Sequence, residues 1–128
     1  MVTEKIQVML KNYFEVLYSQ NLTLFDEIFY TECFLFTVQD RLALSRKISE
    51  YREIVVNRSS PLKLGSPRND EILAIDVLSY EMAIAKVRFR LNENYIIAYL
   101  NTLKVEGSWK ITTILYHIEI IKPLCNNN

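Results

Sequence analysis

The chain has 128 residues, 50% of them apolar, and its 15 basic side chains balance 15 acidic ones. This composition fits one packed domain and excludes a disordered chain, while the zero net charge argues against nucleic-acid binding, which usually needs a basic excess. Only 2 glycines are present, so neither a phosphate-binding loop nor a dinucleotide-binding fingerprint can be formed.

The amino-terminal segment predicts two helices. Apolar side chains at three- and four-residue spacing indicate a first helix capped by Thr3, and they are Ile6, Met9, Leu10, Tyr13, Phe14 and Leu17. A short second helix is predicted over residues 24–29, with Thr23 as its cap. Each helix is apolar along one side only, so the two must share a partner surface.

Extended and helical patterns alternate next. Residues 31–38 are rich in aromatic and β-branched side chains and predict a strand, and a short second strand follows over residues 41–44. Ser45 is placed to cap a third helix. The inner face of this helix is expected to carry three large apolar side chains: Ile48, Tyr51 and Val55.

The second half of the chain predicts an antiparallel meander. Residues 57–70 are dense in turn-forming residues and indicate a loop, with or without one short edge strand. Four strand-like runs follow, joined by short turns: residues 71–79, 82–91, 95–105 and 108–121.

The last two runs are apolar on both faces. Along residues 95–105 the side chains of Tyr95, Ile97 and Tyr99 are expected on one face of the strand. The apolar side chains of Ile96, Ala98 and Leu100 alternate with them and are expected on the other face. In residues 108–121 the side chains of Trp109, Ile111 and Leu115 are expected on one face, opposite Ile114, Tyr116, Ile118 and Ile120. Helices can cover one face only, so we expect a homodimer built on the outer face of the sheet.

Five segments resemble proteins of the nuclear transport factor 2-like superfamily. They are residues 12–15, 21–25, 80–87, 99–103 and 107–111, with the sequences NYFE, NLTLF, YEMAIAKV, YLNTL and GSWKI. The branch that the chain resembles most is the bacterial group labelled "putative lumazine-binding", related to the SnoaL-like polyketide cyclases and the ketosteroid isomerases.

The resemblance implies an α+β fold of the cystatin-like, nuclear transport factor 2-like kind, in which a cone-shaped, curved antiparallel sheet packs against three N-terminal helices. We expect a single domain over residues 1–128, with a core from about residue 3 to 121 and a tail over residues 122–128. Relatives use an apolar pocket at one end of the cone for small hydrophobic molecules, or keep it as a docking surface.

Seven aromatic or polar side chains are candidates for lining such a pocket. They are Tyr13, Phe36, Tyr51, Tyr95, Tyr99, Trp109 and His117. Aromatic residues at this spacing are also typical of an ordinary core, so both interpretations stay open.

The catalytic interpretation of the resemblance rests on Tyr13. Isomerase relatives place an oxyanion-binding tyrosine on the first helix, where Tyr13 falls, and a carboxylate base on the first strand. The base position matches Thr37, whose hydroxyl cannot take a proton near neutral pH. A shifted alignment would offer Asp40, although a residue in a turn is typically a solvated turn former.

His117 and Asp76 complete the catalytic candidates. His117 is the only histidine, which excludes multi-histidine metal sites, and it could act as a base or lie at the sheet surface. Asp76 interrupts an apolar strand and is most simply a residue of its polar face.

The sequence therefore favours a non-enzymatic domain that binds a small hydrophobic molecule. The alternatives are a small lyase or isomerase of the polyketide cyclase or ketosteroid isomerase kind, and a structural dimerisation module. No cofactor, metal or membrane segment is expected. The cysteines Cys33 and Cys125 are expected to be free thiols in a cytoplasmic protein.

Overall fold

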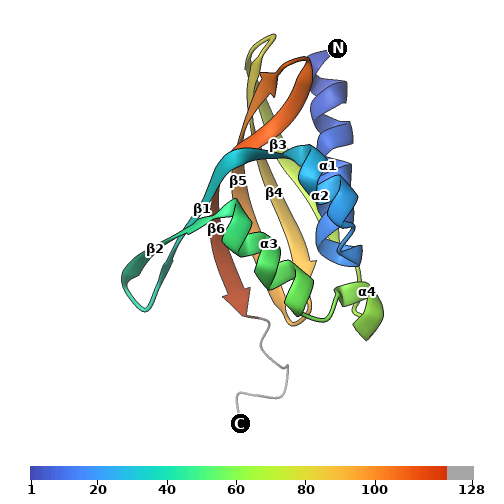
Figure 1. The fold of residues 1–128 in the computed structure, drawn as a ribbon, viewed down its shortest axis with the longest axis vertical. Helices are drawn as coiled ribbons and strands as arrows, with labels where there is room; N and C mark the ends of the chain where they lie inside the picture. The colour runs from blue at the N-terminus through green and yellow to red at the C-terminus, as the bar shows by residue number, and fades with distance from the viewer. Residues whose placement is uncertain (121–128) are drawn as a thin grey trace.

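The protein is described by a computed structural model over residues 1–120. Four helices and six strands follow one another along the chain (Figure 1): α1 (Val2–Ser19), α2 (Leu22–Ile28), β1 (Phe29–Gln39), β2 (Leu42–Lys47), α3 (Ile48–Asn57), α4 (Pro61–Leu64), β3 (Asp70–Ser79), β4 (Met82–Leu91), β5 (Asn94–Val105) and β6 (Ser108–Ile120). Expectations for Ile121, Cys125 and the tail lie outside the described residues.

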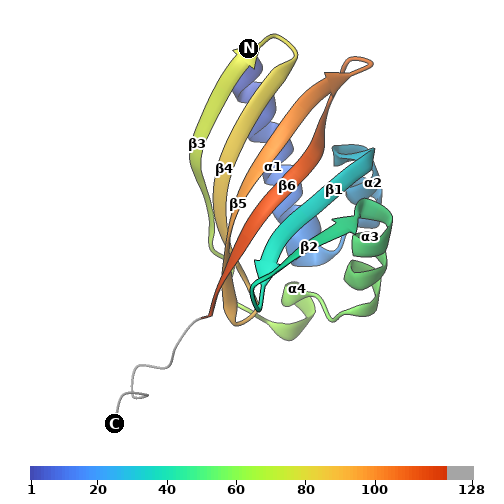
Figure 2. The same cartoon turned by 90° about the vertical axis from the view of Figure 1, so that its left-hand side faces the viewer.

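The six strands form one curved sheet in the order β2-β1-β6-β5-β4-β3. Neighbouring strands are antiparallel except β1 and β6, which run parallel. In Figure 2 the sheet faces the viewer, α1 lies behind it, and α2 and α3 lie beside β1 and β2. The predicted α+β class, with helices against a curved sheet, is confirmed.

The core lies between α1 and the inner face of the sheet. Ile6 and Leu10 of α1 are completely buried, and each such side chain contributes roughly 1.5–3 kcal/mol through removal from water. On the sheet, Ala83, Ala85 and Ala98 are also buried. Their small side chains let α1 pack closely against this part of the sheet.

A β-bulge in β6 changes the predicted faces of that strand. The pairing of β5 with β6 shifts between Asn101 and Thr102, which leaves Thr112 as an extra residue on β6. Ile111 and Ile114 are consequently both buried, although strict alternation places them on opposite faces. The predicted assignment of Ile111 to the face opposite Ile114 is therefore wrong.

Three predicted helix starts are also wrong. Helix α1 begins before Thr3, with Met1 at its N-cap position. The side chain of Asn21, and not that of Thr23, caps α2 by accepting a hydrogen bond of 3.1 Å from the Leu24 N–H. Ser45 lies within β2, and α3 begins only at Ile48.

The loop before the meander contains a helical turn and no edge strand. The Ser60 hydroxyl accepts a hydrogen bond of 3.0 Å from the Lys63 N–H at the start of α4, and Pro61 occupies its first position. Gly65 ends the turn with φ of 67°, a conformation that other residues rarely adopt. The side chains of Ser60 and Pro61 are buried, so α4 closes one end of the core.

No helix within residues 1–120 is both long enough and apolar enough to cross a lipid bilayer.

The cap of α2 can be tested by substitution. Asn21→Ala removes the acceptor for an otherwise unpaired helical N–H and should lower the free energy of unfolding by about 1 kcal/mol. Thr23→Ala is the matched control, because Thr23 is exposed and makes no cap. Urea unfolding measures both variants, and an equal loss for the two would contradict the assignment of Asn21.

Candidate functional site

A cavity of about 210 Å³ lies between α1, α3 and the inner face of the sheet. Twelve residues line it: Tyr13, Leu35, Arg46, Tyr51, Ile54, Arg58, Phe89, Leu91, Ile96, Ile114, Tyr116 and Ile118. They come from both helices, from five of the strands and from the residue that follows α3. Most of the lining is therefore apolar, with tyrosine hydroxyls and two guanidinium groups as its polar part.

Side-chain size along the sheet explains where the cavity forms. The buried inner row of β4 begins with Ala83 and Ala85, against which α1 packs, and continues through Val87 to Phe89. Phe89 lines the cavity, and Ile96 of the neighbouring strand lies opposite it in the pairing of β4 with β5. The cavity thus occupies the end of the sheet where the inner side chains are large.

Tyr13 forms one wall of the cavity. Its side chain is buried, and its ring makes edge-on contacts with Phe29 at 6.1 Å and with Phe89 at 5.7 Å between ring centroids. Burial raises the pKa of Tyr13 well above its usual value of 10, and the nearby Tyr51 adds to this increase. Tyr13 is therefore a neutral hydroxyl group that can donate a hydrogen bond at physiological pH.

Tyr116 lies on the same face of β6 as Ile114 and Ile118. Burial raises its pKa, and the positive charge of Arg46 opposes this increase, which places that guanidinium within electrostatic reach of the Tyr116 hydroxyl. The Tyr116 carbonyl accepts a hydrogen bond of 2.7 Å from the Thr37 hydroxyl. Thr37 thus ties β1 to β6 and offers no base to the cavity.

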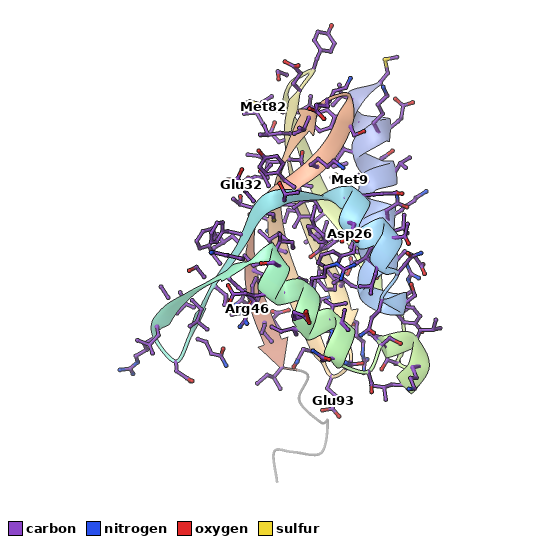
Figure 3. All side chains as sticks on the ribbon, viewed as in Figure 1. Met9, Asp26, Glu32, Arg46, Met82 and Glu93 are labelled. Atoms are coloured by element: carbon purple, nitrogen blue, oxygen red, sulfur yellow. The ribbon has the colours of Figure 1, made fainter. Side chains whose placement is uncertain are left out.

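Arg58 contacts a second tyrosine of the cavity wall. Its Nη2 donates to the Tyr51 hydroxyl at 3.4 Å, and its guanidinium lies 5.7 Å from the centre of the Tyr51 ring. The Nε of Arg58 is buried and makes no hydrogen bond to any residue within 1–120. Figure 3 shows Arg46, the second arginine of the cavity, beside the start of α3.

Two of the predicted pocket residues, Tyr13 and Tyr51, line this cavity. Tyr95 and Tyr99 lie on the outer face of the sheet, where Arg88 and Lys86 cover their rings at 3.8 Å and 5.4 Å. The remaining three residues also lie outside the cavity: Phe36 stacks on Phe34, Trp109 borders a separate groove beside α1, and His117 is exposed.

The predicted catalytic residues are not brought together. Tyr13 lies in the core, whereas His117 and Asp76 are exposed on the other face of the sheet. The alternative base, Asp40, is exposed in the β1–β2 turn with φ of 52°. No acid or imidazole within the described residues therefore shares the cavity with Tyr13.

Arg46, Arg58 and Tyr116 were not among the predicted site residues. Tyr116 could have been found from its two-residue spacing from Ile114 and Ile118, once the Thr112 bulge is taken into account. Arg46 continues the two-residue spacing of Leu42 and Leu44 in β2, a pattern that could have placed these three side chains on one face. Arg58 follows α3 on a segment with no apolar periodicity, so no sequence signal points inward there.

Within residues 1–120, no cluster of three or more histidine, cysteine or acidic side chains is suited to hold a metal ion.

The model of one protein family, described as "Putative lumazine-binding", matches residues 1–117. The chain belongs to this family. The match spans every element from α1 to most of β6, so it includes all the cavity-lining residues except Ile118. A search of the curated proteins gives no match.

Solved structures show the same fold at low sequence identity. A nuclear transport factor 2-like protein of unknown function from Shewanella baltica OS155 has a TM-score of 0.80 at 23% identity, over 91% of this chain and 93% of that one. One from Silicibacter pomeroyi DSS-3, also of unknown function, has a TM-score of 0.77 at 14% identity, over 91% and 95%.

A cystatin-like fold protein from Burkholderia xenovorans LB400 has a TM-score of 0.72 at 12% identity, over 95% of this chain and 94% of that one. The resemblance predicted from the sequence is thereby confirmed: this member of the family described as "Putative lumazine-binding" has a nuclear transport factor 2-like fold.

Tyr13 should make the stability of this family member depend on alkaline pH. Its folded-state pKa lies above its unfolded value near 10, so its contribution is complete below pH 10 and is lost as the pH rises further. The loss reaches at most about 1.4 kcal/mol per pH unit. Urea unfolding at about pH 9 and about pH 11 should show a smaller decrease for Tyr13→Phe than for the wild type.

Tyr80→Phe is the control for this comparison, because Tyr80 is 85% exposed. It should follow the wild-type decrease at both pH values. If Tyr13→Phe did so too, the buried hydroxyl of Tyr13 would not be responsible for the pH dependence.

Proposed function

We propose that the protein binds a small hydrophobic molecule in the cavity between α1, α3 and the sheet. The observation that carries this proposal is the cavity itself, about 210 Å³ in volume and lined mainly by apolar and aromatic side chains. Ligand sites are typically concave and apolar, with a few polar groups that set the orientation of the ligand.

The volume of the cavity limits the size of the ligand. Sites for drug-sized molecules measure roughly 300–1,000 Å³, and an apolar cavity of roughly 150 Å³ accommodates benzene. A cavity of about 210 Å³ suits a molecule of one or two rings. We therefore infer a compact ligand with a predominantly apolar body.

Binding is favoured over isomerisation because the cavity contains hydrogen-bond donors without a general base. Proton abstraction requires a group that accepts a proton near neutral pH within reach of the substrate. The lining offers the phenols of Tyr13, Tyr51 and Tyr116 and two arginines. These groups can orient a ligand, whereas none of them is a base at neutral pH.

The proposal can be tested with a panel of one- and two-ring aromatic compounds, each supplied as an acid, an amide and an amine. Ligand-observed NMR should detect binding of at least one compound to the wild-type protein. Ile54→Trp places a bulky ring at the cavity wall and should weaken that binding by about tenfold or more, a change of about 1.4 kcal/mol.

Val56→Trp is the matched control, because Val56 lies on the same helix, is 44% exposed and does not line the cavity. The Val56→Trp variant should bind the same compound as tightly as the wild-type protein does. If no compound of the panel bound, or if both tryptophan variants bound as well as the wild type, the cavity would not be the site of ligand binding.

We also propose that two copies associate through the outer face of the sheet. Phe36, Leu115, Tyr99 and Lys86 form a row across β1, β6, β5 and β4, in which the three apolar or aromatic side chains are 41–58% exposed. None of the helices within residues 1–120 covers this face (Figure 2). Lys86 borders the same hollow as Asp76, so both charges needed for self-complementary contacts are present.

Leu115→Asp should disrupt such a dimer, because it places a charge in the middle of the apolar row. We expect at least about a tenfold increase in the dimer dissociation constant, measured by sedimentation equilibrium. Leu62→Asp is the control, since Leu62 is 55% exposed on α4, away from the sheet. A wild-type protein that stays monomeric at high concentration would contradict the proposal.

A further inference from the structure

We propose that the ligand is an organic anion whose carboxylate-like group binds Arg58 while its apolar body fills the rest of the cavity. This inference rests on the proposed function and specifies the chemical class of the ligand. It is carried by the charges of the cavity and by the surroundings of Arg58.

The cavity has positive charges without compensating negative ones. Arg46 and Arg58 both line it, and no acidic residue is among its lining residues. Neither arginine forms a salt bridge with any residue within 1–120. Partly burying a charge without a partner is unfavourable, and a bound anion removes this cost.

Three other arginines of the described chain, Arg52, Arg68 and Arg88, are paired with carboxylates. Arg52 binds Asp26 through two hydrogen bonds of 2.8 and 2.9 Å. Arg68 lies 2.8 Å from carboxylate oxygens of both Glu15 and Asp70. The two cavity arginines differ from these paired arginines because they line a cavity and have no acidic partner within the described chain.

The guanidinium of Arg58, a residue that lines the cavity, is incompletely hydrogen-bonded. Its Nε is buried without a hydrogen bond to residues 1–120, and its contact with the Tyr51 hydroxyl is long, at 3.4 Å. A guanidinium holds a carboxylate best through two parallel N–H donors, and the planar guanidinium of Arg58 carries such donors beside the cavity. The Tyr13 and Tyr51 hydroxyls line the same cavity and can donate to an anion.

The backbone of Arg58 is fixed from two sides. Its N–H donates to the Ile54 carbonyl at 3.1 Å, which completes the end of α3. Its carbonyl accepts a hydrogen bond of 2.8 Å from the side chain of Gln20, the residue that ends α1. The guanidinium therefore starts from a backbone position that is defined before ligand binds, which reduces the entropy lost on binding.

The wall of the cavity that the sheet forms has no group that would favour a second charged group on the ligand. Leu35, Phe89, Ile96 and Ile114 are each at most 7% exposed and form an apolar wall. A ring system can pack against this wall while its anionic group reaches Arg58. Inorganic phosphate lacks an apolar body, and an amine would be repelled by both arginines.

The test compares affinities of acid, amide and amine forms of the same aromatic compounds by isothermal titration calorimetry. The carboxylate form should bind at least about tenfold more tightly than the amide of equal size, which corresponds to one charged hydrogen-bonding contact. The amine should bind more weakly than either. This ranking is measured on the wild-type protein and does not depend on any variant.

Arg58→Gln should abolish the preference for the acid over the amide, a ratio of affinities that is measured within the one variant. Arg58→Lys retains the charge without the planar donor pair and should preserve part of the preference. Arg52→Gln is the matched control on the same α3, because its carboxylate partner is Asp26 and it does not line the cavity. It should keep the full preference.

The possible results separate this inference from the proposed function. If amides bound as tightly as acids, and Ile54→Trp weakened both, the cavity would be a neutral binding site and the inference would be overturned alone. If Arg58→Gln kept the preference for acids, the anion would bind elsewhere, and the assignment to Arg58 would be overturned. If no compound bound, both proposals would fail.

Discussion

Close packing of α1 against small side chains on the inner sheet face is the constraint on which the rest of the structure depends. Ala83 and Ala85 allow the helix to approach one end of β4, whereas at the other end the large Phe89 contacts the rings of Tyr13 and Phe14 at 5.7 and 6.1 Å and lines the cavity. The same size gradient that fixes the position of the helix therefore leaves the cavity beside α3. The packed core and the cavity thus both follow from the sizes of the side chains on the inner face of the sheet.

The cavity combines an apolar wall with an incompletely paired cation. The Nε of Arg58 is buried away from water, and its guanidinium forms no salt bridge with an acidic residue within residues 1–120. Its ties to Tyr51 and to the ends of α1 and α3 keep it in place in spite of this. Stability is commonly reduced at sites that are organised for a ligand, because the missing contacts are made only upon binding.

Strand positions were predictable from the sequence because runs of β-branched, aromatic and other apolar residues are bounded by clear turns. Helix caps were not, because Asn21 and Thr23 are both good capping residues and the choice depends on where the previous helix ends. Arg58 was also not predictable, since a long flexible side chain in the loop after a helix has no periodicity that reveals its direction. Of the aromatic candidates, only Tyr13 and Tyr51 line the cavity, because alternation along β5 directs Tyr95 and Tyr99 outward.

The bulge at Thr112 has a consequence for how this fold can acquire new ligands. It sets the phase of the whole carboxyl-terminal half of β6, because every residue after it alternates from that point. Loss of the bulge without a change in length would pair Thr112 with Asn101 and exchange the two faces, turning His117 and Leu115 inward and Tyr116 and Ile118 outward. A one-residue shift in the pairing of β6 with β5 would thus give the cavity an imidazole in place of a phenol, and would change every position of this half of the strand at once.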